Sequence, residues 1–330
     1  MYFLGLLNSA RSAAGRRAFG RVADSLAQET TKKKLFIGWD MIRSLLQYGS
    51  SFEEYYNLRF YERSHQNRGT FITTYYNLRR YHRMYFLDKR LFNQKFHAYI
   101  RRDWVDLENP ADDLLAFFKK HPQAVIKPKQ GDSGKGVCLV TLPEPVTQED
   151  VLTLKETYKG ALAEEVLRNH PDLRRINPTS LNTMRIITVA GPKGMEILYA
   201  GLRVGAAGEV VDNISKGGSV AAIDASTGQV VSGLFCKATC KTDRTLTGDA
   251  VVGLRIPCWT QVIEMLAGAA GELPQMRYMA WDVAVTQTGP ALIEGNHTSG
   301  NAVIQLHCGL DQEGLKPRME EILKKVGISE

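Results

Sequence analysis

The chain has 330 residues, of which 44% are hydrophobic, and it carries a formal net charge of +7 at pH 7. This composition is typical of a soluble globular protein large enough for two or three lobes. It disfavours a secreted, disulfide-linked protein, because the five cysteines are odd in number and scattered, with no secretory signal before them. We therefore expect free thiols and a cytoplasmic location. Cys236 and Cys240 have a spacing that zinc could use, but no second pair of ligands accompanies them.

Residues 1 to about 105 are predicted to be mainly helical, and they hold the whole basic surplus. Residues 1–110 contain 19 Lys and Arg against 10 Asp and Glu, and Tyr and Phe are frequent there. Such a region could bind an anionic or glycan-linked partner, or nucleic acid, by stacking and charge. The simpler interpretation is a helical layer with aromatic rings in its core and charges in solvent. Residues 1–30 could form an amphipathic helix with at most a peripheral contact to a membrane.

A helix is predicted at 111–120, and the apolar strand, glycine-rich loop and second apolar strand that follow occupy residues 124–140. The loop glycines would let the backbone approach a polyphosphate, and Lys127 and Lys135 would bring positive charge. The loop runs into a strand, whereas a Walker A loop opens a helix, and no dinucleotide-binding glycine motif follows a strand. We therefore expect a phosphate cover of another kind, the alternative being an ordinary glycine turn with two surface lysines.

Three segments of the middle of the chain are predicted from their patterns: a helix at 148–158, a hinge at 161–168 and a polar loop at 169–180. Two β-segments follow between residues 181 and 205, joined by a turn at 190–194. They carry Arg185 and Arg203. A shift of one residue in the pairing decides whether these side chains share a face, and the sequence leaves that register open.

A β-hairpin is predicted between a helix at 257–271 and a terminal helix at 315–326. Its strand segments, 279–285 and 291–296, are linked by residues 286–290, within which a three-residue loop would have Gly289 at its last position, where a left-handed backbone is needed.

This loop would place Asp282 directly opposite Glu294, with Asn296 on the same face two residues further on. Carboxylates at such a separation repel each other unless something positive lies between them. Two carboxylates and an amide oxygen form a hard donor set that suits one or two Mg²⁺ ions, with Mn²⁺ as a substitute, completed by water and a substrate phosphate. The alternative is an acidic pair that faces solvent by coincidence.

Six motifs of the chain occur in the order seen in ATP-grasp enzymes. They are Lys127 at a strand end, the loop 131–136, the stretch 163–167, the strand 182–187, the run 212–218, and Asp282 with Glu294-Gly295-Asn296. Over residues 80–310 the chain therefore resembles the ATP-grasp superfamily, and most closely its sugar-transfer-associated branch, which is similar to the glutamate-ligase and D-alanine:D-alanine ligase types.

The resemblance implies an α+β fold of the ATP-grasp type, in which two α+β subdomains clamp ATP, preceded by a mainly helical N-terminal region. The implied division is a helical, basic region at 1–105 and an ATP-grasp domain at 106–330. Within that domain, a nucleotide subdomain would occupy 106–162 and a metal and substrate subdomain 163–330.

The resemblance also implies roles for the matching residues. The nucleotide would be held by Lys127, Gly131, Ser133, Gly134, Lys135, Gly136, Glu164, Glu165, Val166, Leu167 and Asn213. Lys127 would bind the α- and β-phosphates, and residues 164–167 would form the hinge that recognises adenine. Arg185 would approach the transferred phosphate or the acyl substrate, and Arg203 could join it as a catalytic group. The Mg²⁺ ligands would be Asp282, Glu294 and Asn296.

The activity implied by the resemblance is ATP-dependent ligation of a carboxylate to an amine through an acyl phosphate, with release of ADP and phosphate. The substrates would be small or carrier-linked, on a sugar-linked, envelope or secondary-metabolite precursor. Residues 297–301 depart from the Pro-Gly that many members have after the metal motif. The resemblance therefore says least about the pocket for the acceptor substrate. Two alternatives stay open: a kinase that phosphorylates a hydroxyl, with His297 as a candidate base, and a nucleic-acid-binding module, which is disfavoured. The oligomeric state is not predicted.

Overall fold

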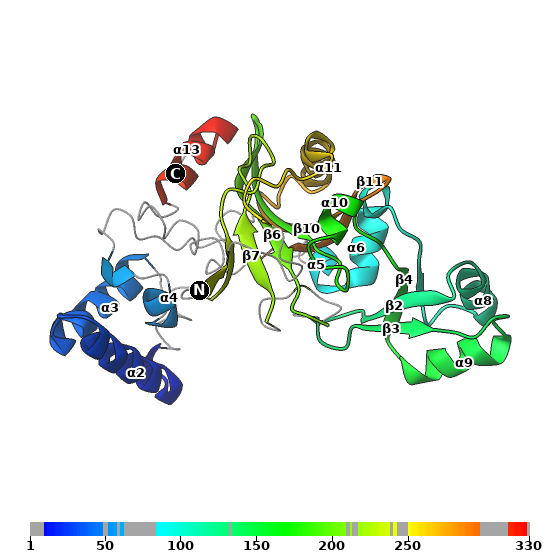
Figure 1. The fold of residues 1–330 in the computed structure, drawn as a ribbon, viewed down its shortest axis with the longest axis horizontal. Coiled ribbons are helices and arrows are strands. Elements are labelled where there is room, and N and C mark those ends of the chain that lie inside the picture. The colour runs from blue at the N-terminus through cyan, green and yellow to red at the C-terminus, as the bar shows by residue number, and fades with distance from the viewer. Residues whose placement is uncertain are drawn as a thin grey trace.

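The computed structural model describes residues 10–48, 52–57, 60–62, 84–131, 134–208, 212, 217–237, 240–242, 250–297 and 316–328. These residues form an N-terminal helical layer, a small four-stranded sheet and a large seven-stranded sheet. The helical layer lies at one end of the long axis and the small sheet at the other, with the large sheet between them (Figure 1). None of the helices in this part of the chain combines the length and apolar character that a membrane span requires.

The N-terminal layer packs around its own hydrophobic core. Its elements are α2 (Ala13–Glu29), α3 (Lys34–Tyr48), α4 (Phe52–Asn57) and the short 3₁₀ helix η1 (Phe60–Glu62). Ser12 starts α2 by accepting a hydrogen bond from the backbone of Gly15 at 3.0 Å, a common helix cap. Leu26, Met41 and Tyr55 are among the side chains buried between the helices. The mainly helical character expected for this region is confirmed for its described residues.

Three further helices, α5 (Met84–Leu87), α6 (Lys89–Lys95) and α7 (His97–Ile100), pack on the large sheet. Phe92 and Phe96 enter the same core as Trp281, and the Phe96 and Trp281 rings meet edge to face with centroids 5.6 Å apart. The domain boundary expected at residue 105 stays a prediction, and this contact reaches across it.

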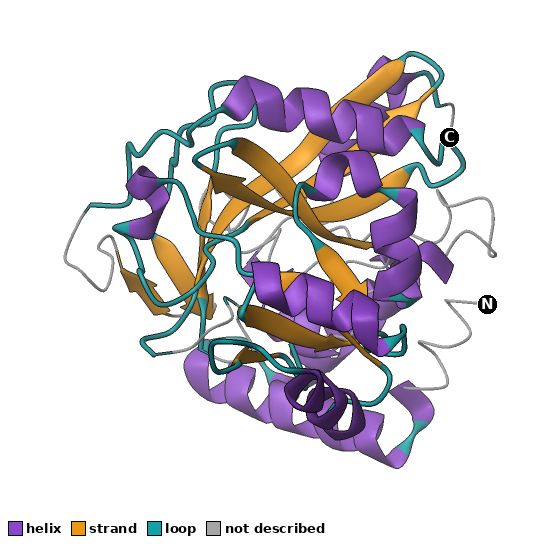
Figure 2. Cartoon of the chain, turned by 90° about the vertical axis from the view of Figure 1, so that its right-hand side faces the viewer, coloured by secondary structure: helices purple, strands orange, loops and turns teal. Residues whose placement is uncertain are grey.

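The small sheet has the strand order β1-β4-β2-β3, with all neighbours antiparallel. Its strands are β1 (Trp104–Asp106), β2 (Gln123–Pro128), β3 (Cys138–Thr141) and β4 (Ala161–Glu165). Helices α8 (Ala111–Lys120) and α9 (Gln148–Thr157) cover one face, where Leu114, Phe118 and Val151 pack against Ala124 and Ile126. Both helices and the strand–loop–strand between them agree with the sequence prediction. Figure 2 shows the molecule from the side of this sheet.

The large sheet has the order β11-β10-β5-β6-β7-β8-β9, and its neighbours are also antiparallel. Its strands are β5 (Met184–Gly191), β6 (Gly194–Val204), β7 (Ser219–Ala222), β8 (Leu234–Lys237), β9 (Cys240–Thr242), β10 (Tyr278–Thr286) and β11 (Gly289–Asn296). Helix α11 (Trp259–Gly271) and the short α10 (Pro171–Arg174) cover the face that α6 and α7 share, and α13 (Lys316–Val326) covers the opposite face. The helices predicted at 257–271 and 315–326 are therefore confirmed.

The hairpin of β10 and β11 differs from the prediction at its turn. Thr286 pairs with Gly289, so the loop contains two residues and not three. That register alone would set Asp282 opposite Ile293. A bulge between Asp282 and Val283 shifts the pairing by one residue, and Asp282 faces Glu294. The predicted acidic pair is confirmed, although the turn that was expected to produce it is not the one present.

Candidate active site

The candidate residues gather where β2 and β4 of the small sheet approach the β10–β11 hairpin. A buried ion-pair network joins the two sheets there. Glu164, on β4, accepts hydrogen bonds from Lys127 Nζ at 2.6 Å, from Arg102 Nε and Nη2 at 2.9 and 3.1 Å, and from Asn93 at 2.9 Å. Arg102 also donates to the backbone carbonyls of Leu292, at 2.6 Å, and Ile293, at 3.2 Å.

This network fixes the charge state of Glu164. Burial alone would raise the pKa of its carboxyl, but Arg102 and Lys127 outweigh burial and hold the pKa well below its usual range. The Glu164 side chain is only 3% exposed and both of its oxygens are occupied. In this arrangement Glu164 orients Lys127 and links the sheets, and it presents no open oxygen to an adenine.

The next residue, Glu165, points to the other side of β4, as alternation along a strand requires. Its Oε2 accepts a hydrogen bond from the backbone N–H of Asp103 at 3.0 Å. Val166 and Leu167 follow β4 directly and are half-buried. Their expected role in a hinge that recognises adenine stays a prediction.

A second charged cluster surrounds Asp282 on the large sheet. Arg185 on β5 donates to both carboxylate oxygens of Asp282, through Nε to Oδ1 and through Nη2 to Oδ2 at 3.0 Å, and Arg203 on β6 donates to Oδ2 at 2.8 Å. Arg203 also pairs with Asp212 at 2.7 Å. The register that the sequence left open therefore places both arginines on the face that carries Asp282.

The positive charge expected beside the acidic pair is thus supplied, on the side of Asp282, by two arginines. Burial works to raise the pKa of Asp282, but Arg185 and Arg203 overcome it and bring the pKa to about 2. Glu294 has no such pair, and burial together with the charge of Asp282 raises its pKa. Asn296 donates to Glu294 Oε1 at 3.2 Å. Glu294 is therefore the carboxylate whose charge is least neutralised.

The two arginines differ in what they can reach. Arg203 is 7% exposed and lies between two carboxylates, whereas Arg185 is 22% exposed. This placement favours Arg185 as the arginine that contacts a substrate and Arg203 as the one that holds the strands β6 and β10 and Asp212 together.

The glycine-rich segment between β2 and β3 lies next to Lys127 in the chain. Gly136 has a φ of 73°, and a Cβ there would come within 2.8 Å of Pro128 Cγ, so the position favours glycine on both counts. The carbonyl of Gly131 accepts a hydrogen bond from Lys89 Nζ at 2.8 Å, and the Lys135 side chain is exposed. Gly134 lies in a turn and is half-buried. The predicted nucleotide contacts Ser133 and Asn213 lie outside the described residues.

Sequence reasoning missed Arg102, Asn93 and Asp212. Arg102 and Asn93 lie in a run of good helix formers, and a polar residue in such a run is ordinarily solvated. Arg102 is buried where Arg101, with a φ of 45°, ends α7 and the chain turns towards β1, and Asn93 is buried on α6 against the same Glu164 carboxylate. Asp212 belongs to the motif at 212–218, but the resemblance assigns the nucleotide contact in that motif to Asn213, the next residue.

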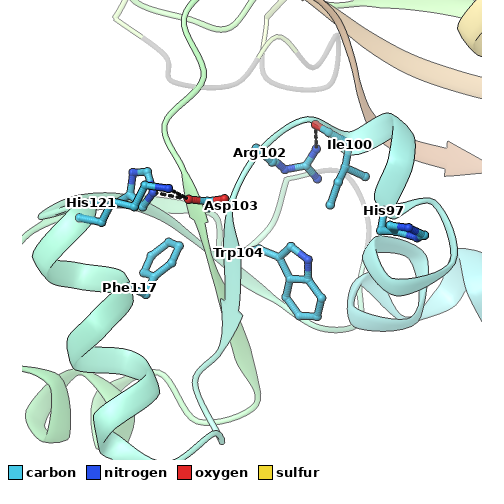
Figure 3. A pocket seen from close by; sticks show the side chains of 8 residues that line it. His97, Ile100, Arg102, Asp103, Trp104, Phe117 and His121 are labelled. Atoms are coloured by element: carbon cyan, nitrogen blue, oxygen red, sulfur yellow. Dashed lines mark hydrogen bonds and ion pairs between the residues drawn. The ribbon is translucent and has the colours of Figure 1, made fainter.

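A cavity of about 330 Å³ lies between α7 and the end of α8, and Arg102 of the buried ion-pair network is one of its lining residues (Figure 3). Asp103 stands at its edge together with His121, at 2.8 Å, and Lys120, at 2.5 Å. Hydrogen bonds from Lys120 and His121 lower the pKa of Asp103. With Glu165 these groups have distances that a metal ion could use, but Asp103 is already paired with a lysine, and we interpret the cluster as an ion-pair network.

Comparison with solved structures finds similar chains among synthetases and ligases. They include N5-carboxyaminoimidazole ribonucleotide synthetase in complex with ADP (10% identity, TM-score 0.41, 66% of this chain and 46% of that chain) and an L-amino acid ligase from Bacillus licheniformis (14%, 0.40, 72% and 44%). N5-carboxyaminoimidazole synthetase from Staphylococcus aureus with ADP matches at 12% identity and a TM-score of 0.44, over 74% of this chain and 52% of that chain. The chain thus spans about half the length of these proteins.

A search of curated proteins found no match. The family model described as sugar-transfer associated ATP-grasp matches residues 71–324, which is most of the chain and includes both charged clusters. The described fold, with a small and a large antiparallel sheet that meet at those clusters, is the ATP-grasp fold. The chain belongs to the sugar-transfer associated ATP-grasp family.

Proposed function

We propose that the protein is an ATP-dependent ligase that joins a carboxylate to an amine through an acyl phosphate and releases ADP and phosphate. The observation that carries the proposal is the meeting of Lys127, from the small sheet, with the acidic pair of the hairpin. Lys127 and Arg102 share the Glu164 carboxylate, and Arg102 also donates to the carbonyls of Leu292 and Ile293, directly before Glu294, so one hydrogen-bond network joins Lys127 to the hairpin. A lysine that binds phosphate oxygens and carboxylates that bind the metal ion are both needed to hold a Mg²⁺-loaded triphosphate, and the two sheets supply one each.

The acidic pair fits Mg²⁺. Glu294 and Asn296 offer hard oxygen donors, and Asp282 keeps capacity on Oδ1, which accepts from one arginine nitrogen, while Oδ2 accepts from two. The raised pKa of Glu294 marks a place where positive charge is lacking. A bound Mg²⁺ would neutralise the phosphates of ATP at this place.

The residues of the chain would then bind and orient the reactants. Lys127, held in position by Glu164, would bind phosphate oxygens, and Arg185 would neutralise charge on the transferred phosphoryl group or on the acyl substrate. The substrate carboxylate itself attacks the γ-phosphate, so the protein needs no nucleophile of its own. The glycine-rich segment after β2 would cover the phosphates and keep water from the acyl phosphate.

We further propose a sugar-linked precursor as the substrate, because the family is described as associated with sugar transfer. This part of the proposal rests on the family alone.

The reaction class is tested by incubating the protein with ATP, Mg²⁺ and hydroxylamine in the presence of pooled carboxylic acids. A ligase of this kind gives a hydroxamate together with ADP. A stable phosphorylated product without hydroxamate would replace the proposal with a kinase. Absence of any nucleotide turnover, together with salt-sensitive binding to random oligonucleotides, would support a nucleic-acid-binding module instead.

The nucleotide site is tested separately with Lys127→Ala, which removes a charge-assisted contact worth about 1.5–3 kcal/mol. ATP affinity should fall by about ten- to a hundredfold. Lys119→Ala, an exposed lysine in the last turn of α8, is the matched control and should bind ATP as the wild type does. Equal affinities of the two variants would remove Lys127 from the site.

A further inference from the structure

One face of α3 exposes a row of large apolar side chains, here called the α3 stripe. It consists of Leu35, Trp39, Ile42 and Leu46, which are 82%, 74%, 39% and 50% exposed. Their spacing of four, three and four residues places them in one line along the helix. Single exposed apolar residues need no explanation, but a continuous row with a tryptophan in it marks a contact surface.

The stripe is not required for the packing of the N-terminal layer. Ile37, Met41 and Leu45 lie on another side of α3 and form its buried contact with the neighbouring helices. Phe19 of α2 packs against α3 at Gly38, where a Cβ would lie 3.1 Å from the ring. Helix α3 therefore has two apolar faces, and its own layer uses only one of them.

The surroundings of the stripe are basic. Residues 10–48 contain eight Lys and Arg against three Asp and Glu. Lys33 and Arg43 are exposed beside the stripe. The three acidic groups are engaged: Asp40 is buried against a tyrosine hydroxyl, Asp24 pairs with a lysine, and Glu29 accepts from a tyrosine. The surface around the apolar row thus favours an anionic partner.

We propose that the α3 stripe docks the protein on the surface of an anionic lipid bilayer. An apolar row with tryptophan, rimmed by Lys and Arg, is the pattern of a helix that lies in the interface plane, with the rings and aliphatic chains among the lipids and the cations at the headgroups. In Figure 1, α2 and α3 lie at the opposite end of the molecule from the small sheet, so a docked helix leaves the candidate active site uncovered.

A second copy of the chain suits this surface less well. A stable protein interface takes about 20–30 residues a side, whereas the stripe is one helix row. Pairing two stripes would also bring the Lys33 and Arg43 side chains of both copies close together, and like charges oppose such a contact.

The test is co-sedimentation of the full chain with vesicles of phosphatidylcholine alone and of phosphatidylcholine mixed with phosphatidylglycerol. We expect binding to the mixed vesicles that weakens with added salt, and a blue shift of tryptophan emission on binding. Trp39→Glu should reduce partitioning at least tenfold. Lys33→Gln and Arg43→Gln should each reduce it about fivefold, the factor expected for one basic residue near an anionic surface. Leu152→Glu, at an exposed leucine on α9, is the matched control and should bind as the wild type does.

Thermal unfolding of Trp39→Glu should match the wild type, because the side chain is exposed, and this separates docking from folding. Failure of the wild type to bind mixed vesicles would overturn the proposal. Binding of Trp39→Glu to mixed vesicles as tight as that of the wild type would also overturn it. A third contrary result would be a wild-type dimer in light scattering that Trp39→Glu converts to a monomer, with no binding to vesicles. None of these outcomes depends on nucleotide turnover, so the proposed activity and the docking surface stand or fall separately.

Discussion

Glu164→Gln probes the network that joins the two sheets. The substitution keeps the shape of the side chain and removes its charge, so Arg102, which is 2% exposed, and Lys127 lose the counter-charge between them. Breaking a buried ion pair by removing one partner costs about 3–5 kcal/mol. Arg102 keeps its bonds to Asn93 and to two backbone carbonyls, and Lys127 can reach water, so we expect the lower end, about 3 kcal/mol.

Thermal unfolding is the assay. For a chain of 330 residues, with an unfolding entropy of about 2.1 cal/mol/K per residue, about 3 kcal/mol lowers Tm by roughly 4 °C. Glu165→Gln is the matched control, because it is the same substitution one residue away at a side chain that accepts one backbone N–H, a bond that the amide oxygen can keep. If Glu164→Gln unfolds within about 2 °C of Glu165→Gln, the network does not stabilise the fold as argued here.

The same comparison has a definite pH dependence. The folded-state pKa of Glu164 is lowered, so its contribution is fully present above the pKa of an unfolded glutamate, about 4.3, and is lost as the pH falls towards the lower folded-state pKa. The difference in Tm between wild type and Glu164→Gln should therefore be constant near neutral pH and shrink on acidification below that value.

Three further substitutions test the large sheet. Glu294→Gln should abolish Mg²⁺-dependent turnover while leaving Tm unchanged or higher, since burial and Asp282 already disfavour the charged form; a large fall in Tm would contradict this. Asp282→Asn should lower the free energy of unfolding by about 3 kcal/mol, because two arginines lose their counter-charge, and denaturant titration measures it. Gly295→Ala should cost about 1–3 kcal/mol, since a Cβ would lie 2.9 Å from an aromatic ring, whereas Gly20→Ala, with nothing within 4 Å, should not destabilise α2.

Much of the fold follows from local pattern. Helices α8 and α9, which cover the small sheet, were predicted from amphipathic spacing. The two strands around the glycine-rich loop were predicted from apolar runs, and neither pattern depends on a distant part of the chain. The acidic pair was also predicted, but the two-residue turn and the bulge at Ile293 shift the register in opposite directions, and no local signal announces a bulge. The alternative of an acidic pair that faces solvent by coincidence is wrong for Asp282, which is buried between two arginines.

The buried part of the site could not be predicted in the same way. Arg102 and Asn93 gain their roles only when α7 ends and β1 and β4 pair, which brings together residues more than sixty positions apart. Whether Arg185 and Arg203 share a face depends on a register set by the whole β5–β6 hairpin, including its own bulge between Ile187 and Thr188. Such contacts depend on tertiary packing, and the pattern of a single segment does not predict them.

The bonds of Arg102 to the β11 carbonyls bear on how ATP could enter. They tie the small sheet to the hairpin through groups with almost no access to water. Swinging one lobe away from the other would break these hydrogen bonds from a charged donor, each worth about 1.5–3 kcal/mol. We therefore expect the two sheets to move together as one rigid body. Entry of the nucleotide should then depend on a local rearrangement of the glycine-rich segment between β2 and β3.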